Sequence, residues 1–128
     1  MSYYIGTTLG PGFDEAVRRT TAALKEEGFG VLTEIDVADT LKKKIGVDFR
    51  RYRILGACNP KLAHEALQIE GNIGTMLPCN VVIQEAADGK IEVAAIDPVA
   101  SMMAVENPRL KQAAEQVRDK LQRVVSRL

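Results

Sequence analysis

Two cysteines in near-mirror settings are the residues of this chain best suited to chemistry. They lie in the tripeptides Cys58-Asn59-Pro60 and Pro78-Cys79-Asn80. Asn followed by Pro is typical of a helix start, so we expect Cys58 to lie just before a helix N-terminus. The free amides and dipole of such a terminus stabilise a thiolate and lower the pKa of the thiol. If the fold brings Cys79 beside Cys58, the two thiols would form a redox pair or bind a soft metal such as Zn or Cu.

Two interpretations of the cysteines remain open. The 21-residue step between them is not a zinc signature. The single histidine, His64, would complete a metal site, although its predicted helix turns it toward solvent. In the other interpretation both cysteines are small core residues, because free cysteine is among the most buried residue types. The candidate thiol or ligand site comprises Cys58, Asn59, Pro60, Cys79 and Asn80, and the candidate metal ligands are Cys58, Cys79 and His64.

Other reactive groups each have a structural alternative. Met102 and Met103 could add thioether ligands for Cu(I), or they could serve as adaptable packing. Arg51 and Arg53 share one face of a predicted strand, where they could bind an anion or form a charged edge that deters aggregation. The chain contains neither a glycine-rich nucleotide motif nor a nucleophile elbow, so neither nucleotide binding nor a Ser/His/Asp triad has direct support.

Hydrophobic periodicity predicts alternating strands and helices that must position these residues. The predicted elements are a strand at 2–9, a helix from Phe13 to Gly28, a strand at 29–35, a short helix from Asp36 to Gly46, a strand at 50–58, a helix from Asn59 to Gly71, strands at 79–85 and 90–96, and a helix from Asn107 to the chain end. Asp88-Gly89 is a hairpin signal, and residues 99–105 are ambiguous, with a short helix capped by Asp97 as one interpretation. This order predicts an α+β fold with an antiparallel or mixed sheet and helices packed on one face.

Apolar residues also fall outside the expected helix–sheet core. Leu32 and Val82 lie on strand faces opposite the main apolar set, which favours a homodimer that covers them. In the short helix, we expect Ala38, Leu41 and Ile45 to face inward.

Length and charge exclude several classes of protein. The 128 residues predict a single domain spanning 1–128. The 17 Lys and Arg residues balance 17 Asp and Glu residues, which argues against a nucleic-acid partner and against an electrostatic membrane anchor. No apolar run approaches the roughly 20 residues that span a bilayer, and the N-terminus lacks the pattern of a signal peptide. We therefore expect a cytoplasmic protein without a permanent disulfide.

Longer motifs resemble a known family. The segments RILGACNP at 53–60, LPCN at 77–80 and DGKIEVAAIDP at 88–98 are similar to the domain of unknown function 302 family, and the similarity extends from about residue 3 to the final helix. The resemblance implies an α+β fold on an antiparallel sheet, like the class that contains the TATA-binding protein, and it implies no firmly assigned activity. The hallmark positions of the family correspond to Cys58, Asn59, Pro60, Leu77, Pro78, Cys79 and Asn80.

Three functions follow as hypotheses. The first is a non-enzymatic homodimer that binds a ligand or partner near Cys58 and Cys79. The second is a thiol-redox or soft-metal protein that uses the same cysteines. The third is an enzyme that holds a small anionic substrate through Arg51 or Arg53. None of the three requires a cofactor other than the soft metal of the second.

Overall fold

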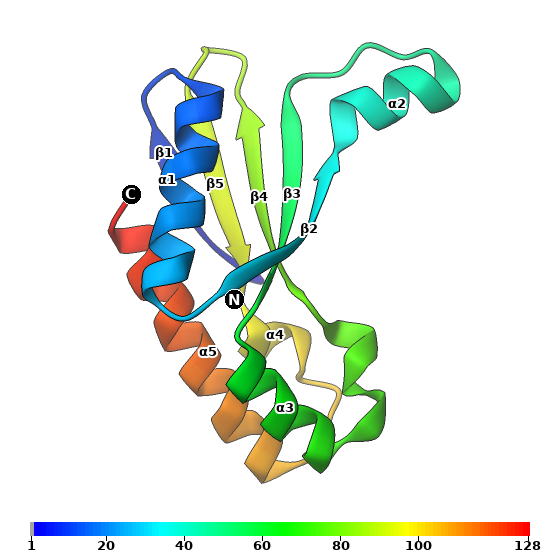
Figure 1. The fold of residues 1–128 in the computed structure, drawn as a ribbon, viewed down its shortest axis with the longest axis vertical. Coiled ribbons are helices and arrows are strands. Elements are labelled where there is room, and N and C mark those ends of the chain that lie inside the picture. Colours follow the sequence, from blue (N-terminus) through cyan, green and yellow to red (C-terminus); the bar gives the residue numbers. More distant parts are fainter. Residues whose placement is uncertain (1) are drawn as a thin grey trace.

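The computed structural model describes residues 2–128, which form one five-stranded antiparallel sheet with helices (Figure 1). The strands are β1 (Tyr4–Leu9), β2 (Gly30–Asp36), β3 (Tyr52–Cys58), β4 (Cys79–Glu85) and β5 (Ile91–Ile96), in the spatial order β1-β5-β4-β3-β2. The helices are α1 (Phe13–Glu26), α2 (Val37–Ile45), α3 (Pro60–Ile69), α4 (Pro98–Ser101) and α5 (Pro108–Ser126), with a short 3₁₀ helix, η1, at Gly71–Met76. The predicted α+β class is confirmed, and all neighbouring strands are antiparallel.

Capping side chains place the helices where the sequence predicts them. Asn59 precedes α3, and its Oδ1 accepts a hydrogen bond from the backbone N–H of Leu62 at 3.2 Å. Asn107 caps α5 in the same manner, and Asp97 caps the short helix α4 within the ambiguous segment. These caps satisfy backbone amides that have no partner inside the helix.

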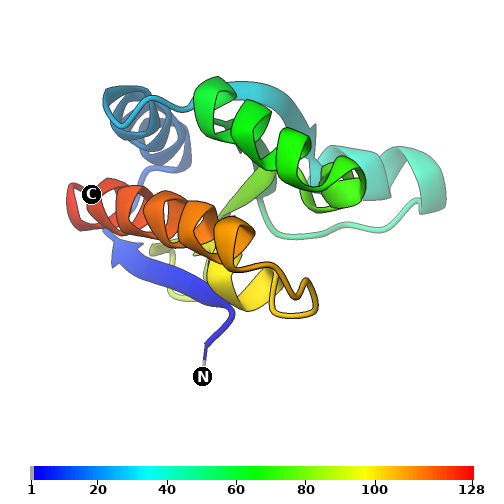
Figure 2. The ribbon, with the colours of Figure 1, turned by 90° about the horizontal axis from the view of Figure 1, so that it is seen from below.

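The main core lies between the sheet and the helices. Helices α1 and α5 pack against the sheet and against each other, and α3 packs against α5 (Figure 2). The most deeply buried large side chains come from both layers and include Leu24, Leu55, Ile83, Ile91 and Leu121. No helix within residues 2–128 combines the length and the apolar character needed to cross a membrane.

Helix α2 departs from the prediction. It extends beyond the sheet after β2, away from the other helices, so it contacts only β2 and β3 among its main neighbours (Figure 1). None of its residues is buried, and Ile45 is 66% exposed. The expectation of an inward face is wrong for Ile45, whereas Ala38 and Leu41 are half-buried, because α2 packs beside β2 and β3 without a second layer of helices over it. Leu32 is also exposed, at an irregularity in the β2–β3 register.

Candidate functional site

The structure places the predicted site residues on two opposite sides of the sheet. Cys79 and Asn80 are successive residues of β4, so their side chains point to opposite faces. Cys79 is buried beneath the helices, whereas Asn80 is exposed on the face that the helices leave open. Cys79 therefore lies on the face that the helices cover, and Asn80 lies on the open face.

Cys58 and Cys79 line one small apolar cavity between the end of the sheet and the helices. Cys79 is the cross-strand partner of Ala57, which places Cys58 one residue beyond that pair at the end of β3. The cavity has a volume of about 40 Å³. Its other lining residues are Phe29, Ala57, Asn59, Leu62, Ala63, Ala66, Leu77, Pro98, Met102, Leu110, Ala113, Ala114 and Val117.

The surroundings of the thiols favour their protonated forms. Burial raises the pKa of Cys58 above its usual value. Burial, together with the neighbouring Cys58, raises the pKa of Cys79 to about 11. The predicted low-pKa thiolate at Cys58 thus finds no support, although Asn59 and Pro60 do begin a helix immediately after it. Both cysteines are neutral thiols at physiological pH.

His64 lies apart from the cysteines. It is exposed on α3 and does not line their cavity, because the apolar stripe of this helix, with Leu62 and Ala66, faces the interior instead. Across residues 2–128, no group of three or more His, Cys, Asp or Glu side chains is arranged to hold a metal ion. A metal held jointly by Cys58, Cys79 and His64 is not supported by this arrangement.

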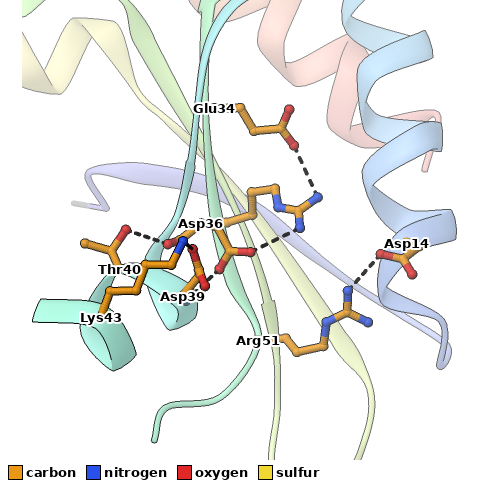
Figure 3. A network of polar contacts seen from close by, with 8 residues as sticks. Asp14, Glu34, Asp36, Asp39, Thr40, Lys43 and Arg51 are labelled. Atoms are coloured by element: carbon orange, nitrogen blue, oxygen red, sulfur yellow. Dashed lines mark hydrogen bonds and ion pairs between the residues drawn. The ribbon is translucent and has the colours of Figure 1, made fainter. Parts of the chain in front are cut away.

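The two arginines proposed as anion ligands are already paired with carboxylates (Figure 3). Arg51 contacts Asp14 at 2.8 Å. Arg53 contacts Glu34 at 3.2 Å and Asp36 at 3.5 Å. Because these carboxylates offset the positive charge, the arginines join α1 and β2 to β3 and leave little charge for a small anionic substrate. The hypothesis of an enzyme built on them gains no support.

A broad groove lies on the open face of the sheet. This tyrosine groove has a volume of about 560 Å³. All three tyrosines of the chain line it. Its lining residues are Tyr3, Tyr4, Gly6, Thr7, Thr8, Tyr52, Asn80, Val82, Gln84, Glu92, Val93, Ala94 and Ile96.

Strand register sorts the residues of the tyrosine groove into rows that cross the sheet. Cross-strand partners lie about 5 Å apart, so each row forms a continuous strip. A polar row runs through Thr8, Glu92, Gln84 and Tyr52. The next row is small and apolar, with Gly6, Ala94 and Val82. The groove therefore has an apolar floor with a polar strip along one side.

Tyr4 closes the other side of the floor. It is the cross-strand partner of Ile96, and its ring contacts the ring of Tyr3 edge-on with centroids 5.1 Å apart. The ring also lies so close to Gly6 that a β-carbon there would be 3.3 Å from Cε2 of Tyr4. Glycine at position 6 thus leaves room for the ring at the groove floor.

Most of the tyrosine groove could not be predicted from the sequence, although Val82 and Asn80 were already candidates. A signal was present in the alternate residues of the strands, since Tyr4, Gly6 and Thr8 share one face of β1. What the pattern could not provide was the strand order that brings β1 beside β5.

These features define an α+β protein. Its helices cover one face of an antiparallel sheet, and an open groove lies on the other face. The chain belongs to the family described as Domain of unknown function DUF302, whose sequence profile matches residues 5–128. The crystal structure of an uncharacterized conserved DUF302 protein from Bacillus stearothermophilus is similar, with a TM-score of 0.92 and 29% identity over 99% of this chain and 98% of that chain. No functionally curated protein matches the sequence.

Proposed function

We propose that this chain is a small-molecule-binding module whose ligand occupies the tyrosine groove. The observation that carries the proposal is the gathering of all three tyrosines, with Asn80, Gln84 and Glu92, around one open hollow. Its volume, about 560 Å³, lies within the range of ligand pockets. Aromatic rings offer apolar area, and hydroxyl and amide groups offer the few hydrogen bonds that fix orientation.

The rows of the groove indicate the chemistry of the ligand. An apolar body would lie on the floor formed by Gly6, Ala94 and Val82, and a hydrogen-bond-donating head would reach Glu92 in the polar row. Glu92 is the only charged side chain that lines the groove in the described part of the chain. A neutral or cationic head is therefore favoured over a carboxylate or phosphate. Nearby Arg50 is held by Gln84, to whose Oε1 its Nε donates at 3.0 Å.

A matched series of probes tests this proposal. Phenethylamine, 2-phenylethanol and phenylacetate share one apolar body and differ in the charge of the head. Amide resonances of β1, β4 and β5 should shift most with the amine and least with the carboxylate. Glu92→Gln should remove the advantage of the amine over the alcohol, which we expect to be a few-fold because the charge pair is exposed. Glu115→Gln makes the same change of charge on exposed α5 and should leave the advantage intact.

Two outcomes would overturn the proposal. The first is a set of spectra in which no probe shifts the groove resonances or the carboxylate shifts them most. The second is a protein whose mass in solution doubles with concentration while the groove resonances broaden. In that case a second copy covers this face, as the sequence prediction from Leu32 and Val82 expects, and the groove is an interface.

A further inference from the structure

The outer edge of β1 is the side of this strand that faces away from β5, and no other strand within residues 2–128 pairs with it. On the inner side, the N–H of Asp97 donates to the carbonyl of Tyr3 at 2.8 Å. Along an antiparallel pair, residues that are bonded to the neighbouring strand alternate with residues that are not. The backbone N–H and C=O groups of Tyr4, Gly6 and Thr8 therefore point outward, away from β5.

Only part of this outer edge is satisfied within the chain. The hydroxyl of Ser2 donates to the carbonyl of Tyr4 at 2.9 Å and accepts from the N–H of the same residue at 3.3 Å. In the described part of the chain, no side chain serves Gly6 or Thr8 in this way. The centre of the strand thus offers a donor and an acceptor from each of these two residues.

Strand β1 lacks the features that usually keep an edge strand from pairing with another chain. Its sequence, YIGTTL, contains no charged residue and no proline, and its register with β5 is regular. The opposite edge strand, β2, carries Glu34 and Asp36 and has an irregular register between Val31 and Thr33. Since β1 also lies at the rim of the molecule (Figure 2), its outer edge is the one suited to accept a further strand.

We propose that two copies of this chain associate through their β1 strands, which pair antiparallel and join the two sheets into one. Gly6 of each copy lies opposite the partner's Thr8, and the two Thr7 residues face each other at the two-fold axis. Each pair of Gly6 and Thr8 exchanges two hydrogen bonds, which satisfies every backbone group left open at the outer edge. The surface differs from the one that Leu32 and Val82 predict for a homodimer.

The side chains of β1 fit a second copy because they are complementary to themselves. In this register Ile5 lies opposite the partner's Leu9, and Leu9 lies opposite the partner's Ile5, as a two-fold interface requires. Both residues are half-buried and pack against the main core, so pairing would extend the core of each copy beneath the joined sheet. A shift of two residues would set Ile5 against Thr7 and lose this match. The formal net charge of zero also means that two copies do not repel each other at long range.

This pairing leaves the tyrosine groove open, because the second copy adds to the rim of the sheet and does not cover its face. The apolar row through Gly6 and Ala94 would continue into the partner's Thr8 and Glu92. Each groove would then border the polar row of the other copy. Ligand binding to a single groove does not depend on the dimer, so the two proposals can fail separately.

A charge exchange at Thr7 tests the pairing by sedimentation across a wide range of protein concentrations. The wild-type protein should reach twice the mass of the chain. Thr7→Lys and Thr7→Glu should each weaken association by about fivefold or more, since like charges would meet at the axis. An equal mixture of the two variants should associate again, because lysine then faces glutamate. Thr33→Lys is the control, since it places the same charge at an exposed position of the opposite edge strand and should leave the dimer intact.

Amide signals show where the copies meet. Hydrogen exchange of Gly6 and Thr8 should be slower in the wild-type dimer than in monomeric Thr7→Lys, and the signals of Asn80 and Gln84 in β4 should not change with concentration. Far-ultraviolet circular dichroism and recovery in the mixture show that both variants fold. A wild-type protein that stays monomeric overturns the pairing alone. It is also overturned if the mixture associates no better than either variant, or if Thr33→Lys dissociates the dimer. Broadening of Asn80 and Gln84 as the mass doubles would overturn both proposals, because a second copy would then cover the groove.

Discussion

Replacing Gly56 with alanine should destabilise the protein by about 2 kcal/mol, in the middle of the range for an overpacked site. Gly56 is buried in β3 between Thr33 of β2 and Pro78, which precedes β4. A β-carbon at this position would overlap Oγ1 of Thr33 and would lie 2.8 Å from Cγ of Pro78, where ordinary contacts begin at 3.4 Å. Thr33 is exposed and can turn away, but the proline ring cannot move without shifting the adjacent Cys79.

Urea unfolding followed by far-ultraviolet circular dichroism measures this cost. With a slope of about 2 kcal/mol/M, the midpoint should fall by about 1 M. Gly30→Ala is the control in the same sheet, because a β-carbon at Gly30 meets no atom within 4 Å. Adding Thr33→Ala to Gly56→Ala should recover part of the loss. An unchanged midpoint for Gly56→Ala would refute the close packing of β2, β3 and Pro78 around this residue.

Three further predictions concern the caps, the charges and the thiols. Asn59→Ala should cost about 1 kcal/mol by removing the N-cap of α3, and a urea midpoint equal to that of the wild type would contradict this role. A hydrogen bond from Arg123 holds the pKa of Glu27 below its usual 4.5, so the stabilisation that it provides is lost as the pH falls below that value. Glu27→Gln should therefore flatten the acid limb of a plot of thermal midpoint against pH, and an unchanged limb would contradict it. Because the pKa of Cys79 is about 11 in place of 9.0, its thiolate fraction at neutral pH is about 100-fold lower. Ellman's reagent should react slowly with this thiol until urea is added, and fast reaction in the native state would show that the cysteine is not buried.

Local chemistry explains which parts of the fold could be predicted. Asn59, Asn107 and Asp97 act on amides within three residues, so the sequence alone locates the starts of α3, α5 and α4. The exposure of α2 could not be predicted in this way. Its apolar residues have the spacing of an inward face, but burial also requires another layer, and the position of the other helices depends on contacts far along the chain.

In the candidate site too, local features could be predicted from the sequence, and features that depend on distant contacts could not. The alternation of β4 separates Cys79 from Asn80 and could be predicted from the sequence. The presence of Cys58 and Met102 at one cavity, and of Tyr4 and Tyr52 around one groove, depends on strand order and helix placement. The low pKa predicted for Cys58 rested on its position before a helix, whereas burial, the alternative that the sequence left open, acts in the opposite direction and raises the pKa.

The pairing of β1 with β5 has a consequence for folding during synthesis. Tyr4 of β1 is bonded into the sheet opposite Ile96 of β5, so β1 has no partner in the sheet until β5 has been made. Meanwhile β4 and β5, joined by a tight turn, can pair as soon as they emerge. Strand β1, with Tyr4 and Gly6, can therefore join the sheet only after all four other strands have been made, and the tyrosine groove is the last part of the sheet to form.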